Sequence, residues 1–264
     1  MDLVYIVKKA EVNNELRYSL RSIAKFLPQS TIWIVGYKPS WVQNVNYLPV
    51  EQAGNKWQNS ITNIIAACKC PGISEDFVLM NDDFIAIKPI TNLEESINVS
   101  LGLLSNSIKI HDKKVSNWHK AFKYVDELLK DLNVKEPYYD YETHLPLQIN
   151  KEKYLTVMNL AKVKEFMKTD KILHKRTLYK NIDGNIIPTT LTHDVKILKE
   201  GDVTERIKIC DWISIADNQI KNAYFPKLNK YLESLFPNPC KYEINDIINT
   251  IKPEISTKRD RFGF

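Results

Sequence analysis

Unbroken apolar runs mark the first strands of the chain. Residues 3–7 (LVYIV), 31–37 (TIWIVGY) and 77–80 (FVLM) are rich in β-branched and aromatic side chains and do not alternate with polar positions. Strands with this pattern are buried on both faces, as in a parallel sheet that helices cover. The three runs therefore predict parallel strands of one sheet.

Segments with helical periodicity separate these strands. Apolar residues recur at spacings of three and four in a segment that Asn13 or Asn14 can cap and that Pro28 ends, and residues 57–69 predict a second helix. Strands that alternate with helices indicate an α/β fold, in which a mostly parallel sheet is flanked by helices. Ligands of such folds bind at the carboxyl ends of the strands.

The pattern weakens after residue 90. We expect a single domain over 1–264, in which residues 1–90 form the βαβ core, 91–135 a helical insertion, and 136–264 the remaining part with C-terminal helices. The further helices are expected at about 116–132, at about 151–168, within FPKLNKYLESLF near the C-terminus, and after Pro239.

The composition is that of an ordinary soluble protein, with 44% hydrophobic and 26% charged residues. The formal net charge of +5 favours anionic partners such as nucleotides or nucleic acid, and it identifies neither. No apolar run is long enough to span a membrane, and the N-terminus lacks the features of a signal peptide, so we expect a cytoplasmic protein. There are only seven glycines and no glycine-rich phosphate-binding loop, so nucleotide binding would need another device.

Four cysteines are present. Cys68 and Cys70 are one residue too close for the common zinc spacing, and no histidine pair lies near them in the sequence. We expect Cys68, Cys70, Cys210 and Cys240 to be free, buried thiols.

Two adjacent carboxylates, Asp82 and Asp83, follow the predicted strand FVLM within the segment FVLMNDDFIAI. Two carboxylates at the end of a buried strand repel each other and need a cation or a basic partner. Mg²⁺ or Mn²⁺ would satisfy both, because these ions bind one or two carboxylates together with substrate phosphates. The alternative is a solvated acidic turn in which an aspartate caps the next segment.

Arg17 and Arg21 lie four residues apart on the first predicted helix, so they share one face of it. That helix begins at the same edge of the sheet as Asp82 and Asp83, where two guanidinium groups could hold a diphosphate by bidentate hydrogen bonds. The alternative is a solvated helix face with Glu15 as the local partner of the arginines.

The loop 140–146 combines His144 with the carboxylates Asp140 and Glu142. These are the ingredients of a general base whose proton affinity can be tuned near neutral pH, although a single loop histidine can also be purely structural. Farther along the chain, residues 175–177 (KRT) and Asn181 form a basic, polar cluster that either binds a phosphate or is an ordinary exposed segment.

Several of these segments together resemble a known family. The strings NELRYSLRS, GYKPSW, NDDF and HLP are similar to successive blocks of the Stealth family of sugar-phosphate transferases. The order VYIV, NNELRYSLRS, GYKPSW, KWQNS, NDDF, HLP, KRTLYKN and NPCKYE is more similar still to a group of bacteriophage proteins described as glycosyltransferases. The chain lacks the large spacers of the Stealth family, which favours sugar transfer over transfer of a sugar phosphate.

This resemblance implies a glycosyltransferase-A-like, Rossmann-like fold that binds a nucleotide sugar such as UDP-glucose on residues 1–90 and the acceptor side on 136–264. It implies that a divalent metal, Mn²⁺ or Mg²⁺, binds at Asp82 and Asp83. The donor would contact, by the same resemblance, Asn14, Arg17, Arg21, Lys56, Asn59 and Arg176, and the candidate catalytic residues are His144, Asp83, Asp140 and Glu142.

The acceptor that the phage resemblance favours is a 5-hydroxymethylated pyrimidine in phage DNA, modified in the host cytoplasm. The charge of +5, the basic tail at 258–261 and the aromatic loop at 138–141 are compatible with DNA. Three alternatives stay open: a sugar-1-phosphate transferase, a glycosyltransferase that acts on a cell-surface polysaccharide or small molecule, and a non-catalytic DNA-binding protein.

Overall fold

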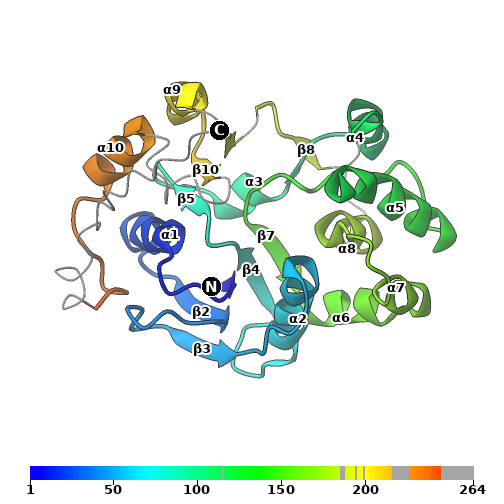
Figure 1. The fold of residues 1–264 in the computed structure, drawn as a ribbon, viewed down its shortest axis with the longest axis horizontal. Coiled ribbons are helices and arrows are strands. Elements are labelled where there is room, and N and C mark those ends of the chain that lie inside the picture. The colour runs from blue at the N-terminus through cyan, green and yellow to red at the C-terminus, as the bar shows by residue number, and fades with distance from the viewer. Residues whose placement is uncertain (115, 185–187, 194, 199, 216–225, 245–264) are drawn as a thin grey trace, which may run out of the picture.

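A central sheet of five strands organises the structure, a computed structural model that describes residues 1–114, 116–184, 188–193, 195–198, 200–215 and 226–244. Its strand order is β3-β2-β1-β4-β7, and the first four strands are parallel whereas β7 is antiparallel to β4 (Figure 1). The strands are β1 (Asp2–Val7), β2 (Thr31–Gly36), β3 (Asn46–Pro49), β4 (Asp76–Met80) and β7 (Leu147–Asn150). The predicted α/β class with a mostly parallel sheet is confirmed.

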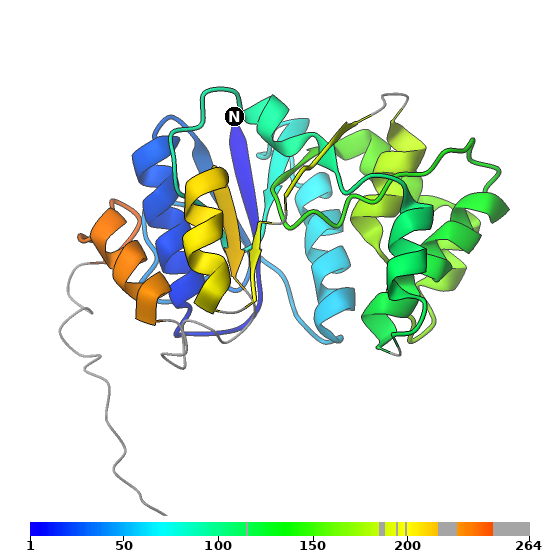
Figure 2. The ribbon, with the colours of Figure 1, turned by 90° about the horizontal axis from the view of Figure 1, so that it is seen from above.

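Two helices cover opposite faces of this sheet, α1 (Asn14–Phe26) and α2 (Lys56–Lys69) (Figure 2). Asn13 is the N-cap of α1, because its side-chain oxygen accepts a hydrogen bond from the backbone N–H of Leu16 at 3.0 Å. Of the apolar stripe predicted for this helix, Leu16, Leu20 and Ile23 are fully buried and Leu27 is half-buried; each fully buried side chain contributes about 1.5–3 kcal/mol through burial. This packing fixes the N-terminal end of α1 near the carboxyl end of β1.

The segment FVLMNDDFIAI connects two different sheets. The chain leaves the central sheet at the end of β4 and then forms β5 (Phe84–Ala86), which pairs with β10 (Trp212–Ile215); β10 also pairs with β9 (Lys196–Ile197). A third, two-stranded sheet joins β6 (Val99–Ser100) to β8 (Thr189–Thr190). The acidic turn therefore lies where the central sheet meets the second one.

The other helices divide between the two faces of the central sheet. The expected helices near 116–132 and within FPKLNKYLESLF are confirmed, but the helix expected at 151–168 is two helices, because the backbone at Leu160 is extended, with ψ of 135°. The segments are α3 (Leu93–Ile97), α4 (Leu104–His111), α5 (Asn117–Asp131), α6 (Lys151–Asn159), α7 (Ala161–Phe166), α8 (Lys175–Asp183), α9 (Glu200–Ile209) and α10 (Pro226–Leu235). Of these, α4 to α8 form one core with α2, whereas α3, α9 and α10 pack in the other core with α1 (Figure 1).

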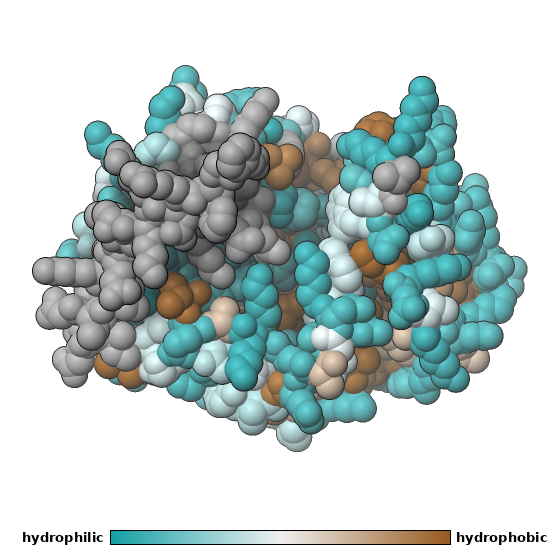
Figure 3. Space-filling view, viewed as in Figure 1, coloured by the Kyte–Doolittle hydropathy of each residue, from teal (hydrophilic) through white to brown (hydrophobic). Residues whose placement is uncertain are grey.

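The remaining expectations from the sequence concern the cysteines, membrane spans and the C-terminal segment. All four cysteines are free; Cys68 and Cys210 are buried, and Cys70 and Cys240 are half-buried. Hydrophilic side chains dominate the face shown in Figure 3. Within the described ranges, no helix combines the length and apolarity that a membrane span requires. The basic tail and most of the segment after Pro239, where another helix was expected, lie outside the described residues.

Candidate active site

A cleft of about 1030 Å³ opens at the carboxyl ends of β1, β2 and β4, which is the edge where parallel sheets bind ligands. The loops after these strands, the first turns of α2 and α8, the 142–144 loop and β9 all contribute side chains to it. Its polar and aromatic lining includes Lys8, Lys9, Tyr37, Tyr47, Glu51, Gln52, Lys56, Trp57, Asn59, Asn63, Asn81, Asp82, Asp83, Trp118, Glu142, His144, Lys175, Arg176 and Lys196.

Asp82 and Asp83 line the cleft, and each is held by a different layer of the fold. The Asn13 side-chain amide donates to Asp82 Oδ2 at 2.8 Å, so the N-cap of α1 positions the first carboxylate. The Ser214 hydroxyl donates to Asp83 Oδ2 at 2.5 Å, and Lys196 Nζ lies 3.8 Å from the same oxygen. Ser214 and Lys196 belong to the second sheet. Asp82 is thus oriented by α1 and Asp83 by the second sheet, so both carboxylates have fixed orientations at the cleft.

The two aspartates fit a divalent cation of the kind that is shared with a substrate. No cluster of three or more histidine, cysteine, aspartate or glutamate side chains with metal-binding geometry occurs in the part of the chain that the structure describes. A closed protein cage is therefore absent from those residues. Mg²⁺ and Mn²⁺ commonly bind through one or two carboxylates and complete their coordination with water and substrate phosphates, which is the donor set that Asp82 and Asp83 offer.

His144 lines the cleft in a left-handed backbone conformation, with φ of 55°. Lys196 Nζ lies 3.5 Å from His144 Nδ1. Burial and the charge of Lys196 lower the pKa of His144 to about 3. The expectation of a base tuned near neutral pH is therefore wrong for this residue. The ring is a neutral imidazole, and with Nδ1 facing a lysine its proton belongs on Nε2.

Glu142 is a cleft carboxylate of the loop 140–146, and it contacts residues at the start of α8. Its Oε1 lies 3.3 Å from the Thr177 hydroxyl and 3.6 Å from His174 Nδ1. Burial alone would raise the pKa of Glu142, but attraction to and hydrogen bonding with His174, together with the charges of Arg176 and Lys175, lower it to about 2. Glu142 is therefore ionised throughout the physiological pH range.

Asp140 was expected to be catalytic, and the structure places it away from the cleft lining. It is 1% exposed, and it accepts hydrogen bonds from the Ser107 hydroxyl at 2.6 Å and from the backbone N–H of Glu142 at 2.9 Å. Burial raises the pKa of Asp140. Its contacts support the loop that carries Glu142 and do not reach the cleft.

The basic cluster at 175–177 is part of the cleft. Lys175 and Arg176 form the first turn of α8 and line the cavity. Arg176 is 8% exposed and donates through Nη2 to the backbone oxygen of Leu145, while its Nε has no hydrogen-bond partner among the described residues. Burial lowers the pKa of Lys175 to about 8. Of the two interpretations left open from the sequence, the structure excludes an ordinary exposed segment.

Lys56 and Asn59, two of the expected donor-binding residues, lie in the first turns of α2 and line the cleft. The Asn59 amide also fixes the preceding turn, because it accepts from Gly54 N at 2.9 Å and donates to Gly54 O at 2.7 Å. Asn14 is the first residue of α1 and is not part of the cleft lining.

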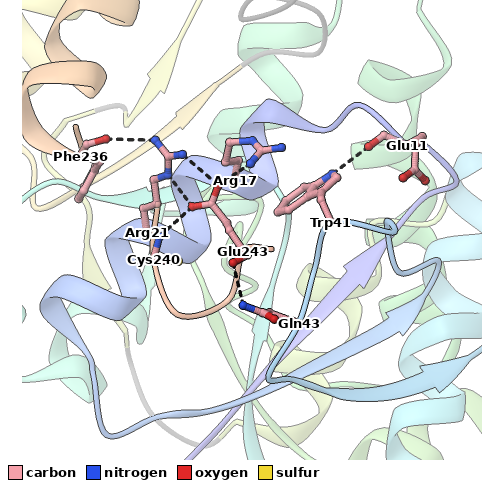
Figure 4. Close-up of polar contacts among 8 residues, drawn as sticks. All are labelled: Glu11, Arg17, Arg21, Trp41, Gln43, Phe236, Cys240 and Glu243. Carbon is pink, nitrogen blue, oxygen red and sulfur yellow. Dashed lines mark hydrogen bonds and ion pairs between the residues drawn. The ribbon is translucent and has the colours of Figure 1, made fainter. Parts of the chain in front are cut away.

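Arg17 and Arg21 are not among the residues that line the cleft, which corrects their expected placement at the donor. Figure 4 shows both side chains beside Glu243. Both bind Glu243: Arg17 through Nη1, and Arg21 through Nε at 2.6 Å and Nη2 at 2.9 Å. The side chain of Glu243 is fully buried. The alternative partner Glu15 was also wrong, because the carboxylate that pairs with Arg17 lies 226 positions away in the sequence.

Several cleft residues were missed from the sequence. Lys8 and Lys9 directly follow the first predicted strand, so their position at its carboxyl end could have identified them. Lys196 and Ser214 lie on the short strands β9 and β10, whose place in the second sheet no local pattern indicates.

Comparison with known proteins identifies structural similarity alone. No protein-family model matches the sequence, and no curated protein sequence matches it. The galactosyltransferase LgtC in complex with donor and acceptor sugar analogues is 10% identical, with a TM-score of 0.42, over 69% of this chain and 70% of that one. The glycosyltransferase GlyE of Streptococcus pneumoniae is 9% identical, with a TM-score of 0.47, over 92% of this chain and 66% of that one.

Mouse xyloside xylosyltransferase 1, in its apo form, is 11% identical, with a TM-score of 0.38, over 83% of this chain and 99% of that one. At identities of 9–11%, these similarities concern the general arrangement of helices and strands.

Proposed function

We propose that the protein is a metal-dependent glycosyltransferase that moves a sugar, a hexose such as glucose, from a nucleotide sugar to an acceptor hydroxyl. The observation that carries this proposal is the placement of Asp82 and Asp83 at the carboxyl end of β4, in a cleft of about 1030 Å³ that is rich in lysine and arginine. A metal-bound diphosphate is the ligand that needs paired carboxylates and cationic side chains in one site.

The charge of the cleft supports a diphosphate. Six cationic side chains face four carboxylates, which leaves an excess of two positive charges before any metal binds; the cations are Lys8, Lys9, Lys56, Lys175, Arg176 and Lys196, and the carboxylates are Glu51, Asp82, Asp83 and Glu142. A bound divalent cation would raise this excess and stabilise the negative charge on the departing nucleoside diphosphate. An anionic donor therefore neutralises the site, and a neutral sugar alone would not.

Three further side chains of the cleft have proposed roles in binding the donor and the acceptor. Arg176 lines the cleft and brings a guanidinium charge to it, which can bind a phosphate or sugar oxygen. His144 supplies a neutral Nε2–H as a hydrogen-bond donor to substrate. Glu142 is ionised and is the cleft carboxylate of the 142–144 loop, so it accepts a hydrogen bond from the acceptor hydroxyl and orients it; with a pKa of about 2 it holds the hydroxyl in place and is a weak base.

For the acceptor we propose a 5-hydroxymethylated pyrimidine in DNA. The excess positive charge of the cleft favours a polyanion, and Trp118 in its lining offers an aromatic face against which an extruded base can stack. An acceptor sugar of a polysaccharide could stack on the same aromatic face, and the experiment below distinguishes the two acceptors.

The test is incubation of the protein with a panel of nucleotide sugars, Mn²⁺ or Mg²⁺, and hydroxymethylated or unmodified DNA. We expect a mass increase on the digested hydroxymethylated nucleoside alone, with release of a nucleoside diphosphate. Release of a nucleoside monophosphate would identify a sugar-phosphate transferase instead. Metal-dependent donor turnover without any DNA product would remove the DNA acceptor and keep the enzyme class.

A matched pair of variants links turnover to the cleft. Asp83→Asn removes a cleft carboxylate and is expected to lower turnover by about 100-fold or more, by analogy with the loss of a group that stabilises the transition state. Asp112→Asn changes a carboxylate that is exposed and pairs with Lys123, and it should leave turnover unchanged. Equal activity in the two variants would refute the proposed role of Asp83.

A further inference from the structure

The segment NPCKYE, which resembles a block of the phage proteins, has no role in the proposed chemistry, yet it ends in Glu243, the partner of both α1 arginines. The Glu243 carboxylate accepts from Arg17, from Arg21 and from the backbone N–H of Cys240 at 3.0 Å. Burial alone would raise the pKa of Glu243, but hydrogen bonding to Arg21 lowers it. A buried, ionised carboxylate with this many donors is rigidly held.

The main chain around Glu243 is joined to residues 41–43. Val42 and Glu243 form an antiparallel β-bridge, Gln43 N donates to Tyr242 O at 3.0 Å, and Ile244 N donates to Trp41 O at 2.9 Å. The Gln43 side chain adds a bond to Glu243 O at 2.8 Å (Figure 4). The C-terminal segment is thus attached both to α1 and to the chain that follows β2.

One path of contacts runs from Glu243 to the acidic turn. Arg17 lies in the first turn of α1, and its backbone N–H donates to Asn13 O at 3.2 Å. The side chain of Asn13, which is 4% exposed, donates in turn to Asp82 Oδ2 at 2.8 Å. The carboxylate proposed to bind the metal is therefore held by the same helical turn that Glu243 holds through Arg17.

A second path runs from Glu243 to the wall of the cleft. The Arg17 guanidinium carbon lies 4.2 Å from the centre of the Trp41 ring, and Trp41 Nε1 donates to Glu11 O at 2.9 Å (Figure 4). The Glu11 carboxylate accepts from the Tyr37 hydroxyl at 2.5 Å, and Tyr37 lines the cleft. Glu243 thus holds the arginine that stacks on Trp41, and Trp41 in turn holds the backbone of Glu11.

From these two paths we infer that Glu243 is a positioning residue for the cleft: it fixes the loop 8–13 and Asp82 through Arg17 without touching the ligand. If Glu243 contributed only to stability, an ion pair with Arg21 would be sufficient, and Arg21 lies one helical turn farther from the cleft. The link through Arg17 is what couples the C-terminal segment to Asn13 and Trp41.

The test uses Glu243→Gln in the full chain. Amide hydrogen exchange measures the loops 8–13 and 37–41, and calorimetry measures the affinity for Mn²⁺ with inorganic pyrophosphate. We expect exchange in both loops to rise, and the affinity to fall by about threefold to thirtyfold, the range of coupling seen for residues that act at a distance. The affinity measurement rests on the proposed function, whereas the exchange measurement does not. If wild type does not bind Mn²⁺ with pyrophosphate, the proposed donor site is refuted. The exchange result then still decides whether Glu243 positions the two loops.

The control is Phe26→Leu, which loosens the contact of the Phe26 ring with Phe236, 6.1 Å away, and leaves the carboxylate of Glu243 unchanged. It should lower the melting temperature without raising exchange in the two loops. If Glu243→Gln does not yield folded protein, Arg17→Lys keeps the charge but loses the stacking on Trp41, and it should give the same loop-specific increase. Faster exchange confined to 240–244 and α1, or equal loop effects of Phe26→Leu, would overturn the inference.

Discussion

The ionised state of Glu142 should make the stability of the protein depend on pH in a specific window. Burial alone would raise the pKa of this carboxyl, but attraction to and hydrogen bonding with His174, together with the charges of Arg176 and Lys175, lower it from 4.5 to about 2. Because one pKa unit is worth about 1.4 kcal/mol, the charged form stabilises the folded protein by about 3 kcal/mol. Glu142→Gln, which keeps one acceptor oxygen and loses the charge, should remove most of that contribution at pH 7.

The sign of the effect follows from the direction of the pKa change. The folded-state pKa of Glu142 is below its unfolded value, so the stabilisation is fully present above about pH 4.5 and is lost as the pH falls toward about 2. Urea unfolding followed by circular dichroism, at a series of pH values from 7 to about 3, measures this dependence. The free energy of unfolding of wild type should fall across this window more steeply than that of Glu142→Gln.

The matched control is Glu127→Gln, which removes a carboxylate from the exposed face of α5. Surface charges contribute about 0–1 kcal/mol, so this variant should follow wild type at every pH. A constant difference between wild type and Glu142→Gln from pH 7 to pH 3 would refute the reasoning, because it would show that the charge of Glu142 is not the source of the stabilisation.

Three other results are expected. Since burial lowers the pKa of Lys175 to about 8, affinity for Mn²⁺ with pyrophosphate should weaken as the pH rises through about 8 in wild type, and Lys175→Gln should remove that step in calorimetric titrations. Asn13→Ala removes the cap of α1, whose bond to Leu16 N is 3.0 Å, and should lower the free energy of unfolding by about 1 kcal/mol while it also weakens Mn²⁺ binding at Asp82. The ring of His144 should show no NMR titration between about pH 5 and 8, because its pKa is about 3; a midpoint near 6.5 would contradict the described burial.

The local pattern predicted three of the five central strands, because β1, β2 and β4 are continuous apolar runs; β3 is mostly exposed and β7 alternates between buried and half-buried residues, and neither was predicted. β1, β2 and β4 are buried on both faces, so their sequences carry a strong signal. β9 has two residues, and no pattern of period two can be detected over that length. The second sheet therefore could not be inferred from local sequence.

The same limit explains which site residues could be predicted. Asp82 and Asp83 were recognised because two acids directly follow a buried strand, and the position alone indicated the sheet edge. Arg17 and Arg21 were correctly placed on one helix face, but their partner Glu243 comes from the distant C-terminal segment. Helical spacing gives the neighbours of a side chain within its own helix, and tertiary packing decides which charge it meets.

The placement of the acidic turn depends on how α1 joins the two sheets. On one side, Asn13 at the start of α1 holds Asp82. On the other, serines of the same helix bind β5, since Ser19 Oγ donates to Phe84 O at 2.5 Å and Ala86 N donates to Ser22 Oγ at 3.1 Å. β5 directly follows Asp83 and would otherwise present an unpaired edge at this point. A shift of α1 along its axis would therefore move both ends of the acidic turn together, so the geometry offered to a cation depends on the packing of one helix rather than on the turn alone.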